Sequence, residues 1–195
     1  MEFTPGLLMP ACHVPVHWIT SSLLSKIAEW KRRRAKLCTA TKKVIEQLNA
    51  ALASELTAIV QYMVQSETCQ NWGYVRLGDF LKRRAIEEMG HAEGLIERIV
   101  FLDATPKVDV ALTPKIGANV QQQLEVDLKD EEDAVHQYNS AMNICAEAGD
   151  NGSGDLFQRM LKDEEGHADF LDAQLHSIKE MGIGTYLAQQ LHGEK

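Results

Sequence analysis

Apolar residues recur every three or four positions along two stretches of the chain. Neither 39–104 nor 115–195 contains a proline, so both are free to be helical. In the first stretch the spacing predicts an amphipathic helix that ends near Trp72 and Gly73. Its apolar positions are Val44, Leu48, Leu52, Leu56, Ile59, Tyr62 and Met63.

A second amphipathic helix is predicted from about Val75 to Leu102, antiparallel to the first. We expect its apolar stripe to face the interior of the fold. The segment 104–117, with two prolines and a glycine, is predicted to be a long connection. The stripe consists of Leu77, Leu81, Ile86, Met89, Leu95, Ile99 and Leu102.

The second half of the chain predicts another helical hairpin. One helix is expected over about 120–148, with Gly149 as its C-terminal stop. The glycine-rich run 149–154 is expected to be a turn. The next helix reaches about Met181, where Gly182 and Gly184 break it, and one more short helix can follow.

Two helical hairpins joined by a long connection predict an all-α fold. This connectivity is that of a ferritin-like four-helix bundle with one long crossover, here with a short fifth C-terminal helix. Hydrophobic periodicity alone fits a bundle without any bound metal equally well.

Charge is unevenly distributed along the 195 residues. The chain carries −8 overall, residues 1–38 carry +4, and residues 39–195 therefore carry −12. An acidic body attracts cations and makes nucleic acid an improbable partner. No apolar run is long enough to predict a membrane span. The four cysteines form no CxxC pair, which favours reduced thiols in a cytoplasmic protein.

An internal repeat carries the candidate chemistry. Glu88–His91 and Glu164–His167 are both Glu-x-x-His, and each is preceded, 33 residues before its glutamate, by another glutamate, Glu55 or Glu131. Each upstream glutamate has a tyrosine seven residues further on. All these positions recur at an offset of 76.

The geometry of a helix explains this spacing. Residues three apart share a helix face, and Glu55 and Glu88 lie at nearly equal distances from the predicted turn at Trp72. Four carboxylates and two imidazoles should therefore converge at one level of the bundle. Buried carboxylates are costly unless paired or metal-bound, and this donor set suits iron or manganese.

At these residues the chain resembles the bacterioferritin family over about 41–192. The resemblance lies in ELTAIVQY, NWGYVRL, EEMGHAE, IERIVFLDATP and KDEEGHADFLD. It implies a di-iron ferroxidase centre in each subunit, with Glu88 and Glu164 as bridging carboxylates and Tyr62 nearby. The implied iron ligands, which are also the catalytic residues, are Glu55, Glu88, His91, Glu131, Glu164 and His167.

The resemblance also implies storage of ferric mineral in a 24-subunit cage. Met89 matches the methionine that binds haem in this family, where one haem b is shared between two subunits. Fe(II) and O2 or H2O2 would be the substrates, and a ferredoxin-like protein is a candidate reductant for iron release. A di-iron or di-manganese oxidase or peroxidase without storage remains the alternative.

The chain departs from the family pattern at three places. Leu95 and Phe170 stand where members often carry a tyrosine and a tryptophan. Arg83 and Glu87 stand where some members carry a histidine and an aspartate, which weighs against an accessory inner iron site.

The third departure is an N-terminal extension, residues 1–40. Its apolar helical face and basic run at 31–34 would suit a membrane, an acidic partner or a targeting receptor. We favour a disordered or partly helical extension without such a role, and expect no membrane partner. The ferritin-like di-iron domain is expected to span 41–195.

Overall fold

The computed structural model of the protein describes residues 21–37, 42–108 and 113–192. The chain divides into two compact units, Met1–Cys38 and Thr39–Lys195. In the first unit, α1 (Ser21–Leu37) is helical, and its apolar residues Leu23, Leu24, Ile27 and Trp30 are exposed. The rest of the N-terminal extension lies outside the described residues.

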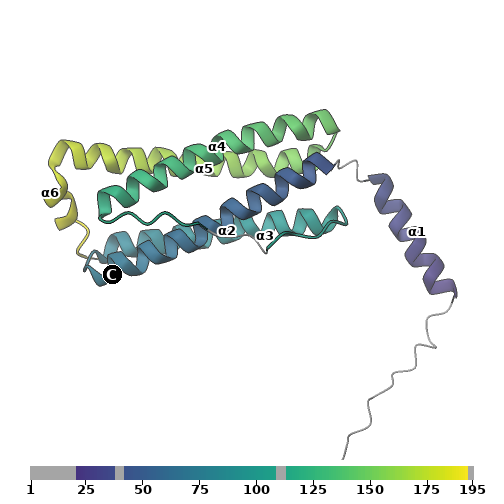
Figure 1. Ribbon diagram of the computed structural model, residues 1–195, viewed down its shortest axis with the longest axis horizontal. Coiled ribbons are helices and arrows are strands. Elements are labelled where there is room, and N and C mark those ends of the chain that lie inside the picture. Colours follow the sequence, from purple (N-terminus) through teal and green to yellow (C-terminus); the bar gives the residue numbers. More distant parts are fainter. Residues whose placement is uncertain (1–20, 38–41, 109–112, 193–195) are drawn as a thin grey trace, which may run out of the picture. The chain divides into compact units, whose positions relative to one another are not determined.

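Four long helices form the second unit (Figure 1). α2 (Lys42–Asn71) packs along α3 (Val75–Phe101), and α4 (Val120–Ala148) packs along α5 (Asn151–Met181). The short α6 (Ile183–Ala188) follows at one end and contacts α5. All regular structure among the described residues is helical, and the ferritin-like bundle expected from the sequence is confirmed.

Glycines set the two hairpin turns. Gly73 adopts a left-handed φ of 86°, and Tyr74 N–H then donates to the carbonyl of Cys69, which closes α2. Gly149 ends α4 in the same way, with a φ of 69°. Both helix ends agree with the sequence.

The second turn is shorter than the glycine-rich run 149–154 suggested. The Asp150 side chain accepts a hydrogen bond from Ser153 N–H, so α5 already begins at Asn151. Gly152 therefore lies inside the helix. A Cβ at this position would lie only 2.8 Å from the Arg98 guanidinium. This glycine serves close packing rather than a turn.

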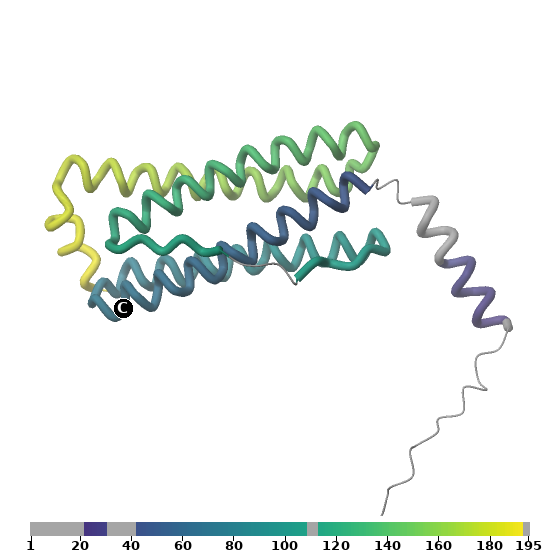
Figure 2. The backbone as a smooth tube through the Cα atoms, in the orientation of Figure 1, coloured from purple at the N-terminus to yellow at the C-terminus, as the bar shows by residue number. Residues whose placement is uncertain are grey.

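The crossover runs back along the bundle from the end of α3 to the start of α4 (Figure 2). Two of its backbone N–H groups donate to amide side chains of α2. Lys107 N–H bonds Asn49 Oδ1 and Lys115 N–H bonds Gln61 Oε1, both at 2.7 Å. At its end Asn119 caps α4 by accepting from Gln122 N–H. The connection is thus held against α2.

The predicted apolar stripes are only partly buried. Leu81, Leu95 and Ile99 lie in the core, but Met63, Ile86 and Met89 are exposed. The stripe of the second helix was expected to face the interior, and at Ile86 this expectation is wrong. Each residue along a helix advances about 100° around the axis. Because Glu88 faces the interior of the bundle, Ile86 and Met89, which are two residues before it and one residue after it on α3, lie on other sides of the helix. Of the described helices, none combines the length and apolar character needed to cross a bilayer.

Candidate metal centre

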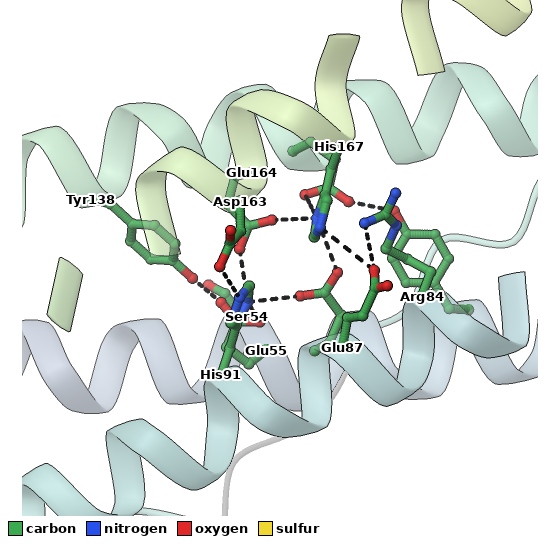
Figure 3. Close-up of polar contacts among 12 residues, drawn as sticks. Ser54, Glu55, Arg84, Glu87, His91, Tyr138, Asp163, Glu164 and His167 are labelled. Atoms are coloured by element: carbon green, nitrogen blue, oxygen red, sulfur yellow. Dashed lines mark hydrogen bonds and ion pairs between the residues drawn. The ribbon is translucent and has the colours of Figure 1, made fainter. Parts of the chain in front are cut away.

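Six side chains from four helices meet in the middle of the bundle. α2 supplies Glu55, α4 supplies Glu131, and α3 and α5 each supply a Glu-x-x-His pair. Five of the six are buried, and the His91 side chain is 12 % exposed. The structure therefore brings together every residue of the set proposed from the sequence. That set is Glu55, Glu88, His91, Glu131, Glu164 and His167. Figure 3 labels four of them, Glu55, His91, Glu164 and His167.

The first half of the cluster surrounds His91. Its Nδ1 lies 3.0 Å from Glu164 Oε1, 3.1 Å from Glu88 Oε2 and 3.6 Å from Glu55 Oε2. Within this half each residue offers one donor atom, and all of these atoms lie within 4.8 Å of one another. Such a group can hold one cation.

The second half surrounds His167. Its Nδ1 lies 2.7 Å from Glu164 Oε2, 3.4 Å from Glu88 Oε1 and 3.7 Å from Glu131 Oε2. Glu88 and Glu164 therefore belong to both halves, each turning one oxygen to each histidine. Two adjacent cation positions that share two carboxylates follow from this arrangement.

Burial and hydrogen bonding divide the carboxylates into two kinds. For Glu164, burial favours the neutral acid, but the close imidazoles of both histidines outweigh it and lower the pKa to about 2. The pKa of Glu88 is lowered by the same balance. Burial prevails at the other two, raising the pKa of Glu131 to about 8 and that of Glu55 well above its usual value.

The histidines carry the balancing charge. Burial works against protonation, but carboxylate partners raise the pKa of His167 to about 11 and that of His91 further. These directions favour two protonated imidazoles beside two ionised and two protonated carboxyl groups, an arrangement that would make the cluster close to neutral without a metal. Two divalent cations that displace these four protons would leave it neutral again.

Two tyrosines cross the bundle to the outer glutamates. Tyr62 on α2 donates to Glu131 on α4, and Tyr138 on α4 donates to Glu55 on α2. Figure 3 shows Tyr138 directed at Glu55. The tyrosines thus repeat the pseudo-symmetry of the ligand set, as their spacing in the sequence indicated.

Hydrogen bonds within the cluster leave several of its buried polar atoms unsatisfied, and bound metal cations could satisfy these atoms. Glu88 Oε1, both Glu164 carboxylate oxygens and His167 Nδ1 are buried, yet none has an oriented hydrogen-bond partner, although their distances to neighbours are short. Unsatisfied buried acceptors are costly. One cation in each half would satisfy them.

Comparison with known proteins identifies the family. The ferritin-like domain family matches residues 45–181. A bacterioferritin of Brucella melitensis biotype 1 is 44% identical over 144 residues, which is 74% of this chain and 89% of the relative. A bacterioferritin of Rhodobacter capsulatus is 44% identical over 140 residues, 72% of this chain and 87% of the relative. One from Mycobacterium avium is 34% identical over 147 residues, 75% and 92% of the two chains.

The chain belongs to the bacterioferritin family.

In this bacterioferritin-family chain, each imidazole also contacts a carboxylate from outside the six-residue cluster. These two contacts were not expected from the sequence. His91 Nε2 lies 3.4 Å from Asp163 Oδ2, and His167 Nε2 lies 3.7 Å from Glu87 Oε2. Glu87 also binds Arg84 at 2.7 Å. Partners of this kind orient ligating histidines. The 76-residue repeat was the available signal, because Glu87 and Asp163 directly precede the shared glutamates.

Leu95 and Phe170, the two departures from the family pattern near the centre, are apolar side chains that pack in or against the core. Leu95 is fully buried, and the Phe170 ring stacks on Phe80 with centroids 4.3 Å apart. Neither side chain can form the stable radical that a tyrosine or tryptophan can.

Met89, the candidate haem ligand, is 45% exposed on α3.

A cavity of about 350 Å3 reaches the centre between α2 and α4. Its lining includes all four glutamates of the cluster, and its exposed or half-buried edge, here called the rim, comprises Ser54, Lys115, Asp130, Asp133 and Gln137. A second hollow lies between α3 and α5 and is lined by both histidines, Arg84 and Lys162. The centre is therefore accessible from two faces of the bundle.

Proposed function

We propose that this protein oxidises Fe(II) at the six-residue centre and stores the ferric product. One observation carries the proposal: Glu88 and Glu164 each belong to two adjacent donor groups, each of which has its own histidine and outer glutamate. Carboxylate with imidazole suits iron, and membership of the bacterioferritin family supports iron storage.

The chemistry follows from the charges of the centre. Two Fe(II) ions replace the protons of the histidines and of Glu55 and Glu131, and the four ionised carboxylates then favour Fe(III) over Fe(II). Each iron loses one electron. O2 takes up the two electrons with two protons to give H2O2, or H2O2 takes up two electrons and two protons to give two water molecules.

Ions can pass through the centre because it is open on both sides. Fe(II) would enter by the cavity between α2 and α4, and the product would leave through the hollow between α3 and α5. In a 24-subunit cage this path leads from outside to a storage space. The cage, the cytoplasmic location and a ferredoxin-like reductant for iron release belong to this proposal.

A haem b shared by two subunits also belongs to the proposal. Met89, which is half-exposed on α3, would bind the haem iron and is accessible to a second copy of the chain. The haem would supply electron transfer when bound. A di-iron or di-manganese oxidase or peroxidase on the same bundle would need neither Met89 nor α6.

Ligand variants test the proposed centre. His91→Ala and Glu164→Ala should each slow Fe(II) oxidation by more than roughly 100-fold. Loss of an outer-shell partner costs up to roughly 100-fold, and loss of a ligand itself should cost more. Helix content should persist, because the apolar core is untouched and the remaining titratable groups of the cluster can gain or lose a proton when a charged partner is removed. Stopped-flow absorbance measures the rate, with exposed His136→Ala and Glu165→Ala as matched controls. Normal rates in both ligand variants would rule out this centre.

A further inference from the structure

One lysine stands at the entrance of the cavity between α2 and α4. Among the described residues that line this cavity, Lys115 is the only basic one. It lies on the crossover, outside the helices, and its side chain is 63% exposed. A cation at the entrance of a cavity that ends in four glutamates bears directly on how other cations enter.

Lys115 is held at both of its ends. Its backbone N–H donates to Gln61 Oε1 at 2.7 Å, and its ammonium lies 2.7 Å from Asp130 Oδ1. Gln61 Nε2 in turn donates to Asp130 Oδ2 at 3.1 Å. The three residues form a closed ring that keeps the ammonium on the rim carboxylate.

The internal repeat shows what the ring adds. Ser54 and Asp130 are 76 residues apart, as are Gln61 and Gln137. The Ser54 hydroxyl bonds Gln137 Oε1 at 3.1 Å, which mirrors the contact between Gln61 and Asp130. The crossover, however, brings an ammonium only to the Asp130 side. Lys115 thus offsets the charge of Asp130, whose repeat counterpart Ser54 is neutral, while the other rim carboxylate, Asp133, pairs with Lys129.

We propose that Lys115 is a tethered counter-ion that occupies Asp130 until an entering divalent cation displaces it, and that it thereby sets the rate of cation entry. The inference rests on the proposed function, in which this cavity leads to the metal centre. Asp130 is then one of the two rim carboxylates, with Asp133, that an incoming cation meets before the four glutamates.

The strength of the ion pair between Lys115 and Asp130 sets how much the lysine slows the entry of a cation. A cation must compete with the ammonium for Asp130, and the exposed lysine can move into water at little cost. Exposed ion pairs of this type correspond to a change of roughly two- to five-fold. Because Lys115 touches none of the six ligands, it changes the barrier to passage in both directions and leaves affinity at the centre almost unaltered.

The test uses Co(II), which reports binding by its absorbance without being oxidised. With the full-length assembled protein, Lys115→Ala should raise the association rate roughly two- to five-fold. Release into a chelator should accelerate by a similar factor, so that the equilibrium dissociation constant stays nearly constant. The gain should shrink at high salt, which screens exposed charges.

Three variants make the test specific. Lys107→Ala is the matched control, because Lys107 has the same backbone attachment to α2 but does not line the cavity. Lys115→Arg should keep the wild-type rates. In an Asp130→Asn background, Lys115→Ala should no longer accelerate entry, since the carboxylate for which the ions compete is gone.

The outcomes separate this inference from the proposed function. Unchanged association rates in Lys115→Ala, or an effect on release alone, would overturn the role of Lys115 while the centre stands. If wild-type protein fails to bind Co(II), or binds it equally well after Glu164→Ala, the proposed function falls and this inference falls with it.

Discussion

Asp127 is a buried carboxylate that stands outside the ligand set. It is 1% exposed, and its Oδ1 accepts hydrogen bonds from Gln61 Nε2 at 3.0 Å and Gln65 Nε2 at 2.8 Å. Its Oδ2 has no hydrogen-bond partner among the described residues. Burial raises the pKa of Asp127 from its usual 3.8 to about 7.

This shift makes stability depend on pH. Between pH 4 and pH 7 the native chain binds more protons at Asp127 than the unfolded chain, so the contribution of this residue to stability falls as pH rises. In Asp127→Asn the side chain no longer titrates and Oδ1 still accepts both hydrogen bonds. The free energy of unfolding of wild type, relative to the variant, should drop by about 1 kcal/mol per pH unit in this window.

Urea unfolding at pH 4.5 and pH 7.5 measures that difference. Asp155→Asn, at an exposed position on α5, controls for the loss of a negative charge. Parallel pH profiles for wild type and Asp127→Asn would show that burial does not shift this carboxylate.

At the scale of the element, the start of α5 depends on one residue. Asp150 is 4% exposed, caps the helix at Ser153 N–H and pairs with Arg98 Nη2 at 2.5 Å. It also accepts a hydrogen bond from the Ser153 hydroxyl. These contacts fix where α5 begins and hence the height at which Glu164 enters the centre.

Asp150→Ala should therefore destabilise the bundle by about 2–4 kcal/mol. About 1 kcal/mol comes from the lost cap, and the rest comes from leaving the partly buried Arg98 guanidinium unpaired. Asn119→Ala, which removes only the exposed cap of α4, should cost about 1 kcal/mol. Denaturant unfolding compares the two, and equal losses would contradict a structural role for the Arg98 pair.

At the scale of the whole molecule, the hairpin α2–α3 carries three exposed apolar side chains. Met63 is 54% exposed, Ile86 58% and Met89 45%. Met89→Leu should abolish haem absorbance but leave assembly and Fe(II) oxidation intact, because leucine keeps most of the side-chain volume. Met63→Leu, an exposed thioether on α2, is the control. Full haem retention in Met89→Leu would contradict axial ligation by Met89.

The N-terminal unit is expected to be dispensable for the bundle. Residues 1–38 carry +4, include none of the six ligands and form a compact unit of their own. Deleting them should leave helix content, assembly size and Fe(II) oxidation essentially unchanged. Size-exclusion chromatography with light scattering, circular dichroism and the oxidation assay measure this. A smaller assembly or slower oxidation would mean that the extension supports the assembly.

The sequence by itself determined the long helices, apart from the start of α5, and the six residues that meet inside the bundle. Helix ends at Gly73 and Gly149 depend on local backbone chemistry, which neighbouring residues specify. The convergence of Glu55, Glu88 and their repeat partners follows from helix rise and equal distances from the turns, which are also linear in the sequence. That is why the 76-residue repeat in the sequence was enough to predict that the six residues lie together.

Only the tertiary structure decided which faces are covered and which distant groups meet. Periodicity placed Ile86 and Met89 in an apolar stripe, yet the packing of α2 against α3 left both exposed. The burial of Asp127 and the contact of Lys115 with Asp130 were likewise invisible, because each depends on where another segment passes. Helical periodicity describes one helix at a time, whereas burial and ion pairing are properties of several segments together.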